Sequence, residues 1–177
     1  MDLLTPSEEE IDQATAHLRF DIPMLADRLV AAAEFSRLDP RTMNLPIGYF
    51  GASTGGGAAL LAAARRPDLC HAVVSRGGRP DLAGEALPQV KCPALLVVGG
   101  HDELVIEMNQ DAMRQMRCEV HLEIVPGATH LFEERGALEK VARLARNFLT
   151  RQLRQTTPTY VLDGLDPQSP QATRFTG

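Results

Sequence analysis

The stretch that decides the fold is residues 47–66, IGYFGASTGGGAALLAAARR. An apolar run comes first, a glycine-rich turn follows at residues 51–55, and an alanine-rich run continues until Pro67 stops it. A short apolar run bounded by turn residues is typical of a strand, and alanine favours helix. We therefore predict a strand over residues 45–50 and a helix over residues 58–66, joined by a sharp turn.

Three more short runs have strand character, and two of them are apolar almost throughout. They cover residues 72–75, 94–98 and 120–125. Continuous apolar runs are expected of strands that are buried on both faces of a parallel sheet. The fold class that follows is α/β, with a parallel sheet of about four strands and helices on both faces.

Apolar residues at helical spacing fill the gaps between these strands. We expect a helix that starts near Leu25 and is stopped by Asp39, and two more near residues 104–116 and 138–149. A more polar helix is predicted over residues 8–18, with Ser7 as its N-cap.

The composition fits one domain with a tail. The chain has 177 residues, and 44% of them are hydrophobic, which is enough for a core. Residues 155–177 contain three prolines and five threonines but no apolar stripe. We predict a partial domain over residues 1–153 and a flexible tail over residues 154–177, with one short ordered stretch at residues 160–162.

Charge and cysteine content exclude several classes of protein. The formal net charge is −5, which argues against binding to nucleic acid or to an anionic membrane. The longest apolar run, residues 58–64, is too short to span a bilayer, and the acidic residues among the first ten do not fit a secretory signal. Three widely spaced cysteines are typical of reduced thiols. We therefore expect a cytoplasmic protein with no nucleic-acid or membrane partner.

Gly51, Ser53 and Gly55 form a G-x-S-x-G motif between the first predicted strand and its helix. In that context the motif is typical of a nucleophile elbow, a strained turn that lifts a serine hydroxyl out of the sheet. We expect both glycines to be required sterically, and the amide of Thr54 to point at a developing oxyanion. A glycine-rich loop with no catalytic role is the other interpretation of this motif alone.

Two other glycine-loop chemistries fail at the residues after Gly55. A phosphate-binding P-loop needs a lysine and then serine or threonine, where this chain continues with Gly56, Gly57 and Ala58. A dinucleotide fingerprint needs a glycine where this chain has the bulky Leu60. The sequence therefore implies no cofactor.

A serine nucleophile needs a base, and the base needs a carboxylate that orients it. Asp102 follows the predicted strand over residues 94–98, and His130 follows the one over residues 120–125. Functional residues of an open parallel sheet gather beyond the carboxyl ends of its strands. Ser53, Asp102 and His130 all lie there, in the order Ser, Asp, His, so we predict a catalytic triad.

The other polar candidates are interpreted as structural. We expect loop, strand or surface roles for His71, His101, His121, Glu103, Arg76, Arg79 and Asp81. For Arg76, Arg79 and Asp81, in the loop after the second predicted strand, the alternative to a salt-bridged rim is contact with an acidic substrate. Glu103 is the alternative to Asp102, although its position one residue later favours the surface. The cysteines Cys70, Cys92 and Cys118 fall near strand starts, away from the predicted site, and no group has metal-ligand spacing.

Four runs together resemble the α/β-hydrolases, and more narrowly their dienelactone-hydrolase-like branch. They are FGASTGGGAALLAAARRPD, AVVSRGGRPDLAG, PALLVVGGHDELV and VPGATHLFEE. The resemblance covers residues 2–149, and that branch includes domains that stand alone or are fused to a phosphoribosyltransferase. It implies that Ser53 is the nucleophile, His130 the general base and acid, and Asp102 the residue that orients it. The implied partner is a small ester, lactone or related acyl substrate.

The chain departs from the family pattern in two ways. Named dienelactone hydrolases use a cysteine nucleophile, so lactone specificity does not carry over to Ser53. Only about fifty residues precede Ser53, so the chain is interpreted as the C-terminal part of the fold, without the N-terminal strands and their oxyanion loop. Residues 1–4 resemble the end of one such strand.

The family's cap insertion is also absent, since only residues 78–93 lie between the second and third predicted strands, so we expect an open site. From the missing N-terminal strands we expect weak activity and self-association through the exposed edge of the first strand. The alternative is a non-catalytic remnant or interaction module that retains the triad by descent.

Overall fold

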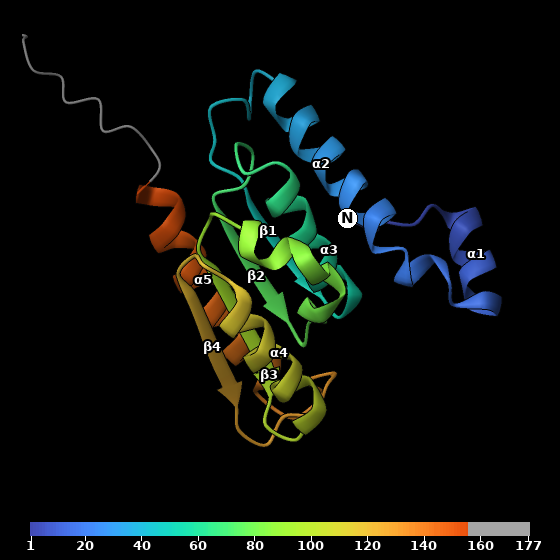
Figure 1. Cartoon of the computed structure of the whole chain (residues 1–177), viewed down its shortest axis with the longest axis vertical. Helices are drawn as coiled ribbons and strands as arrows, with labels where there is room; N and C mark the ends of the chain where they lie inside the picture. Colours follow the sequence, from blue (N-terminus) through green and yellow to red (C-terminus); the bar gives the residue numbers. More distant parts are fainter. Residues whose placement is uncertain (156–177) are drawn as a thin grey trace, which may run out of the picture.

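The four predicted strands form one parallel sheet in a computed structural model that describes residues 1–155. They are β1 (Gly48–Ala52), β2 (Ala72–Arg76), β3 (Ala94–Gly99) and β4 (Val120–Val125). Their order across the sheet is their order in the sequence, and all three pairings are parallel (Figure 1). The predicted α/β class is therefore confirmed.

Helices cover both faces of this sheet. The α-helices are α1 (Pro6–Thr15), α2 (Ile22–Leu38), α3 (Thr54–Arg65), α4 (Glu103–Gln115) and α5 (Ala137–Gln155), and two 3-10 segments are η1 (Leu18–Phe20) and η2 (Pro80–Gln89). On one face lie α3, η2 and α4, with α2 packed against α3 (Figure 1). On the other face, α5 is the one helix found within residues 1–155. None of the helices described is long and apolar enough to cross a bilayer.

Alternation along β2 and β3 divides the core into two layers. Val73 packs on one side with Leu60 of α3, whereas Val74 and Val97 pack on the other side with Val141 of α5. Because side chains alternate across a strand, both faces of these central strands must be apolar if both are covered. That requirement is why both strands are apolar almost throughout.

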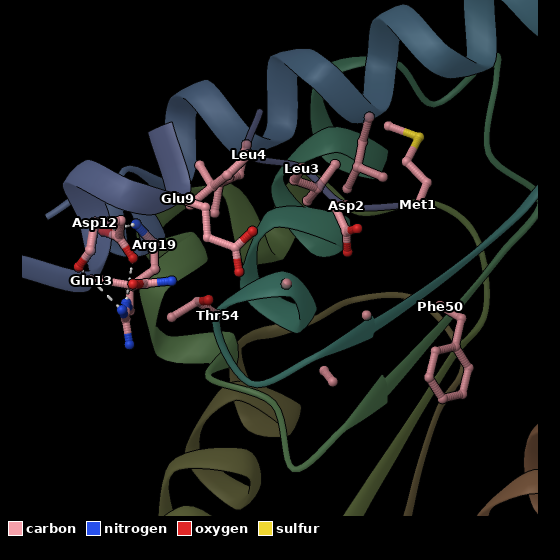
Figure 2. Close-up of a pocket in the computed structure, with 15 residues that line it drawn as sticks. Met1, Asp2, Leu3, Leu4, Glu9, Asp12, Gln13, Arg19, Phe50 and Thr54 are labelled. Atoms are coloured by element: carbon pink, nitrogen blue, oxygen red, sulfur yellow. Dashed lines mark hydrogen bonds and ion pairs between the residues drawn. The ribbon is translucent and has the colours of Figure 1, made fainter. Parts of the chain in front are cut away.

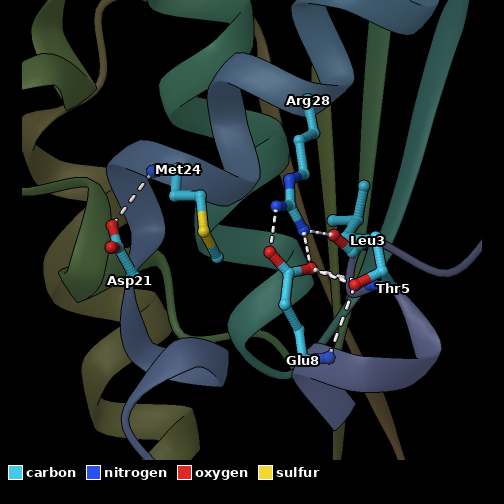
Figure 3. Close-up of polar contacts among 6 residues, drawn as sticks. All are labelled: Leu3, Thr5, Glu8, Asp21, Met24 and Arg28. Carbon is cyan, nitrogen blue, oxygen red and sulfur yellow. Dashed lines mark hydrogen bonds and ion pairs between the residues drawn. The ribbon is translucent and has the colours of Figure 1, made fainter. Parts of the chain in front are cut away.

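Helix α1 begins earlier than predicted. Its N-cap is Thr5, whose hydroxyl accepts a hydrogen bond from the Glu8 amide at 3.4 Å, while the Glu8 carboxylate accepts from the Thr5 amide at 2.8 Å (Figure 3). The polar helix predicted over residues 8–18 is therefore present, but its predicted bounds and its predicted N-cap, Ser7, are wrong. The reciprocal pair satisfies two terminal amides, and Pro6 suits the first helical position.

Glu8 also joins the start of the chain to α2. The guanidinium of Arg28 binds both Glu8 carboxylate oxygens, at 2.5 and 2.7 Å, and reaches the Leu3 carbonyl at 2.5 Å (Figure 3). The hydrogen bonds from Arg28 favour the charged carboxylate and lower the pKa of Glu8 to about 2. One ion pair therefore fixes where residues 1–4 lie, and those residues form no strand.

Helix α3 begins at Thr54, four residues before the predicted start, and it includes Gly55, Gly56 and Gly57. Glycine is a poor helix former, so composition alone places the start too late. Close packing explains the glycines: a Cβ on Gly56 would lie 2.4 Å from the Ser75 hydroxyl, and one on Gly57 would lie 2.6 Å from the Arg79 carbonyl oxygen. They bring α3 against the segment that follows β2.

Helix α5 extends to Gln155, two residues beyond the predicted domain boundary at 153. The rest of the predicted tail, including residues 160–162, lies outside the described residues.

Candidate active site

Ser53 lies in the sharp turn between β1 and α3. Its backbone has φ 50° and ψ −122°, a conformation that is costly for a residue with a side chain. A Cβ on Gly51 would lie 2.1 Å from the Gly55 carbonyl oxygen, so glycine is required at position 51. A Cβ on Gly55 would meet nothing within 4 Å. The expected steric requirement is thus confirmed for Gly51 and wrong for Gly55, whose α-carbon faces open space.

The start of α3 presents free amide groups beside Ser53. The first amides of any helix have no acceptor within the helix, and here they belong to Thr54 and Gly55. Ser53 occupies the N-cap position, but its side chain makes no capping hydrogen bond. The Ser53 hydroxyl and the Thr54 amide are therefore both available to a ligand at the positive end of the helix.

The structure brings His130 and Asp102 together. Nδ1 of His130 lies 2.6 Å from a carboxylate oxygen of Asp102, whose side chain is 16% exposed, whereas that of His130 is 39% exposed. Asp102 is the N-cap residue of α4 but makes no capping hydrogen bond. Its carboxylate is turned to the imidazole instead, and a carboxylate at Nδ1 leaves Nε2 as the ring nitrogen free for proton transfer.

Two backbone contacts hold the loops of Asp102 and His130 against each other. The His101 amide donates to the Ala128 carbonyl at 2.9 Å. A Cβ on Gly99 would lie 2.5 Å from the carbonyl oxygens of Ala128 and Thr129. Glycine at position 99 therefore lets the two loops approach closely enough for the hydrogen bond between their side chains.

Ser53 and His130 border the same turn, which follows β2. The Ser53 amide donates to the Arg76 carbonyl at 3.2 Å, and a Cβ on Gly77 would lie 3.6 Å from Cε1 of the His130 ring. No hydrogen bond joins the Ser53 hydroxyl to His130 within the described residues. Nucleophile–base contacts are often long in unliganded enzymes and tighten with substrate.

The loop after His130 is pinned by its neighbours. Phe132 is buried and has φ 58°. The Arg76 guanidinium lies 5.4 Å from the centre of the Phe132 ring, and it donates a hydrogen bond to the Leu131 carbonyl at 3.4 Å. Glu134 accepts a hydrogen bond from the Thr129 amide at 3.1 Å, and its hydrogen bonding to Thr129 lowers the pKa of Glu134. The imidazole is thus carried by a loop with contacts on both sides.

Sequence reasoning missed Asn109, which lies below this arrangement. Its side chain is fully buried in α4, and Nδ2 donates to the carbonyls of Val105 and Gly78 at 2.7 and 3.0 Å. Arg79, which follows Gly78 in the sequence, donates its amide hydrogen to the Ser53 carbonyl at 3.0 Å. The sequence signal that identifies Asn109 is a single amide side chain within the buried stripe of α4, which also includes Val105 and Ala112.

The polar candidates set aside in the sequence have structural or surface positions. His101 and Glu103 are exposed, His121 lies 2.7 Å from Glu119, and Arg79 pairs with Asp81 at 2.7 Å. Nδ1 of His71 contacts the Ile47 amide at 3.1 Å. No group of three or more His, Cys, Asp or Glu side chains in residues 1–155 could hold a metal ion.

A cavity of about 670 Å³ lies beside the elbow. Its walls come from Ala52, Thr54 and Gly55 at the turn, from Phe50 of β1, and from residues 1–4 under α2 (Figure 2). Ser53, His130 and Asp102 are not among the residues that line the cavity. Sequence reasoning predicted an open site and did not predict this wall. Residues 1–4 supply it because Arg28 and the capping box hold them there.

Comparisons with known proteins agree with this fold. Residues 6–155 match the model of the dienelactone hydrolase family. A crystal structure of a dienelactone hydrolase from Anabaena variabilis is 60% identical, with a TM-score of 0.84 over 86% of this chain and 71% of that one. Est1E from Butyrivibrio proteoclasticus, at 18% identity and a TM-score of 0.65, shares the fold.

A relative from Mycobacterium tuberculosis, named "Putative phosphoribosyl transferase", is 56% identical over 144 residues. The match covers 81% of this chain but only 32% of the relative, so the chain spans about a third of that protein's length. The family model covers most of the chain and the architecture matches the solved relative. The chain therefore belongs to the dienelactone hydrolase family and has an α/β-hydrolase fold.

Proposed function

We propose that this protein is a serine hydrolase of small ester, lactone or related acyl substrates, with Ser53, His130 and Asp102 as its triad. The observation that carries the proposal is the 2.6 Å contact between His130 and Asp102, at the same sheet end as the strained Ser53 turn. A carboxylate behind an imidazole and a serine in a strained turn are the parts that acyl transfer needs.

In the proposed reaction, the Ser53 hydroxyl oxygen attacks the carbonyl carbon of the substrate while Nε2 of His130 takes its proton. Asp102 holds Nδ1 and stabilises the imidazolium that forms. The tetrahedral intermediate then collapses, and His130 returns the proton to the leaving alcohol. Water activated by the same imidazole releases the acyl group from Ser53.

The oxyanion would be held by the Thr54 amide at the start of α3. Removing one donor from an oxyanion hole typically costs about 10²–10³ in rate. Thr54 is the donor that we assign among residues 1–155, so we expect slow turnover and better rates with activated esters. The positive end of α3 adds to the stabilisation.

The cavity beside the turn suits the acyl part of a small substrate. Its volume of about 670 Å³ lies within the range of small-molecule sites. Leu3, Leu4 and Phe50 give it an apolar wall, and charged side chains, namely Asp2, Glu9, Asp12 and Arg19, line the rest. Ser53 in place of a cysteine nucleophile points to esters as well as lactones as substrates.

The alternative is a module that keeps these residues without catalysis. One observation favours it: no hydrogen bond joins Ser53 to His130 within residues 1–155. The name of that relative belongs to the whole protein, whereas the matched part corresponds to a hydrolase family. This module would bind a partner but would not react with acyl substrates.

An active-site serine probe separates the two functions. We expect a fluorophosphonate to label the wild-type protein and to spare Ser53→Ala, while Ser7→Ala, an exposed serine on α1, is labelled normally. Intact mass and peptide mapping would locate the adduct. Absence of labelling in folded wild-type protein, or labelling that persists in Ser53→Ala, would overturn the hydrolase proposal.

A further inference from the structure

The three cysteines occupy equivalent positions in the fold. Cys70, Cys92 and Cys118 each lie two residues before a strand, at β2, β3 and β4 respectively. Parallel strands place equivalent positions at the same edge of a sheet. The thiols therefore share the end of the sheet at which the strands begin. Ser53 and His130 lie at the opposite end, where the strands finish.

Two of these thiols are in contact. The sulfur atoms of Cys70 and Cys92 are 3.7 Å apart, and both side chains are buried. Cys70 also donates to the Ala72 carbonyl at 3.3 Å, which fixes its side chain. The hydroxyl of Tyr49 is buried nearby on β1 and has no hydrogen-bond partner in residues 1–155. All three cysteines are free thiols.

We propose that Cys70 and Cys92 are a modification site, a thiol pair that a peroxide or a small disulfide oxidises to a reversible intramolecular disulfide. The inference does not depend on the proposed hydrolase activity, because the pair lies at the other edge of the sheet. The two sulfurs are in van der Waals contact, so a bond of about 2.05 Å requires them to approach by roughly 1.7 Å.

The oxidation balances with hydrogen peroxide as the oxidant. The Cys92 thiolate attacks one peroxide oxygen, the O–O bond breaks, and water leaves once a proton is taken up, so that Cys92 becomes a sulfenic acid. The sulfur of Cys70 then attacks the Cys92 sulfur, and the second water leaves with the Cys70 proton. Two thiols lose two electrons in total, and one peroxide becomes two waters.

The two thiols are not equivalent as first reactants. The contact with Cys92, together with burial, raises the pKa of the Cys70 thiol, whereas the contact with Cys70 lowers the pKa of Cys92. Cys92 is also slightly more exposed than Cys70. We assign Cys92, the more accessible of the two, as the thiol that reacts first, and Cys70 as the thiol that resolves the sulfenic acid.

Cys118 is the matched control. It precedes β4 as the other two precede β2 and β3, and it is only half-buried. Burial raises the pKa of its thiol. It makes no sulfur–sulfur hydrogen bond in the described part of the chain. If solvent exposure decided which thiols form a disulfide, Cys118 would take part. If contact between sulfur atoms decides it, Cys118 is excluded.

Peptide mapping tests the proposal on the whole chain. Arg76, Lys91 and Arg117 separate the cysteines, so trypsin places each on its own peptide. Folded protein is treated with hydrogen peroxide or oxidised glutathione, alkylated in denaturant and digested. Before alkylation, we expect the disulfide to lower the intact mass by about 2 Da. After alkylation, we expect a fall from three alkylated thiols to one and a linked peptide pair that contains Cys70 and Cys92.

The variants supply the controls. Cys118→Ala should retain the linked pair, Cys70→Ala and Cys92→Ala should lose it, and dithiothreitol should restore all three thiols in the wild type. The wild-type map decides the question even if a buried alanine variant folds poorly. Three free thiols after oxidation, a bond that involves Cys118, or links only between molecules would overturn the proposal.

Discussion

The backbone at Ser53 depends on a single neighbouring glycine. Gly51→Ala would place its Cβ 2.1 Å from a carbonyl oxygen, whereas Gly55→Ala, at the other end of the motif, adds a methyl group to open space. We expect Gly51→Ala to lower the free energy of unfolding by about 1–3 kcal/mol, as overpacking does, and Gly55→Ala to change it by less than about 1 kcal/mol. Urea denaturation measures both. Equal effects would contradict the geometry.

Asp102 and Glu103 are adjacent carboxylates in different environments. Asp102 contacts His130, while Glu103 is exposed in the first turn of α4. If the triad operates, Asp102→Asn should lower kcat by about 10⁴, because the imidazole adopts the wrong tautomer. Glu103→Gln should leave kcat unchanged. Hydrolysis of p-nitrophenyl acetate measures both variants, and loss of activity in Glu103→Gln instead would exchange their roles.

Asn109 couples α4 to the segment beside Ser53. Asn109→Ala leaves the Gly78 carbonyl without this donor, and an unsatisfied buried group costs about 1–3 kcal/mol. We expect that loss in urea unfolding, together with a fall in kcat that exceeds any change in KM. Gln110→Ala, exposed on the same helix, is the control. An Asn109→Ala protein of normal stability would show that the two hydrogen bonds carry little energy.

At the scale of elements, the Glu8–Arg28 pair makes the position of α1 sensitive to acid. The folded pKa of Glu8, about 2, lies below its ordinary value of 4.5. A depressed carboxyl pKa contributes stability above pH 4.5 that is lost as the pH falls toward 2. We expect the melting temperature of the wild type to exceed that of Glu8→Gln at pH 6, and the difference to vanish near pH 2. Glu9→Gln, the neighbouring control, should show no such convergence.

Strand positions could be predicted because burial on both faces leaves a clear apolar run, as at residues 94–98. Element starts were less accurate for identifiable reasons. The start of α1 depends on the reciprocal hydrogen bonds between Thr5 and Glu8. The start of α3 depends on glycines that are needed for close packing, although glycine has a low helix propensity.

In the candidate site too, some features could be predicted from the sequence and others could not. Loop position after a strand was enough to predict that Asp102 and His130 meet, because parallel strands deliver their carboxyl ends to one edge. Asn109 and the wall formed by residues 1–4 could not be predicted, since both depend on contacts between segments distant in sequence.

At the scale of the whole molecule, the outer edge of β1 is unpaired among residues 1–155, and Phe50 on that strand is 51% exposed. An uncovered apolar edge is a template for pairing, and a second copy of the chain offers the same edge. We expect a concentration-dependent dimer in light scattering, and a shift toward monomer in Phe50→Lys. A wild-type monomer at all concentrations would contradict this expectation.

The parallel sheet also sets a distance between two kinds of chemistry. A six-residue strand such as β3 spans roughly 17 Å from its first to its last residue. Conversion of Cys70 and Cys92 to a disulfide creates no charge, and it takes place at the end of the sheet away from His130. A fluorophore attached to Cys118 would in turn report on unfolding without disturbing the hydroxyl of Ser53, so one labelled protein can serve for stability and turnover measurements alike.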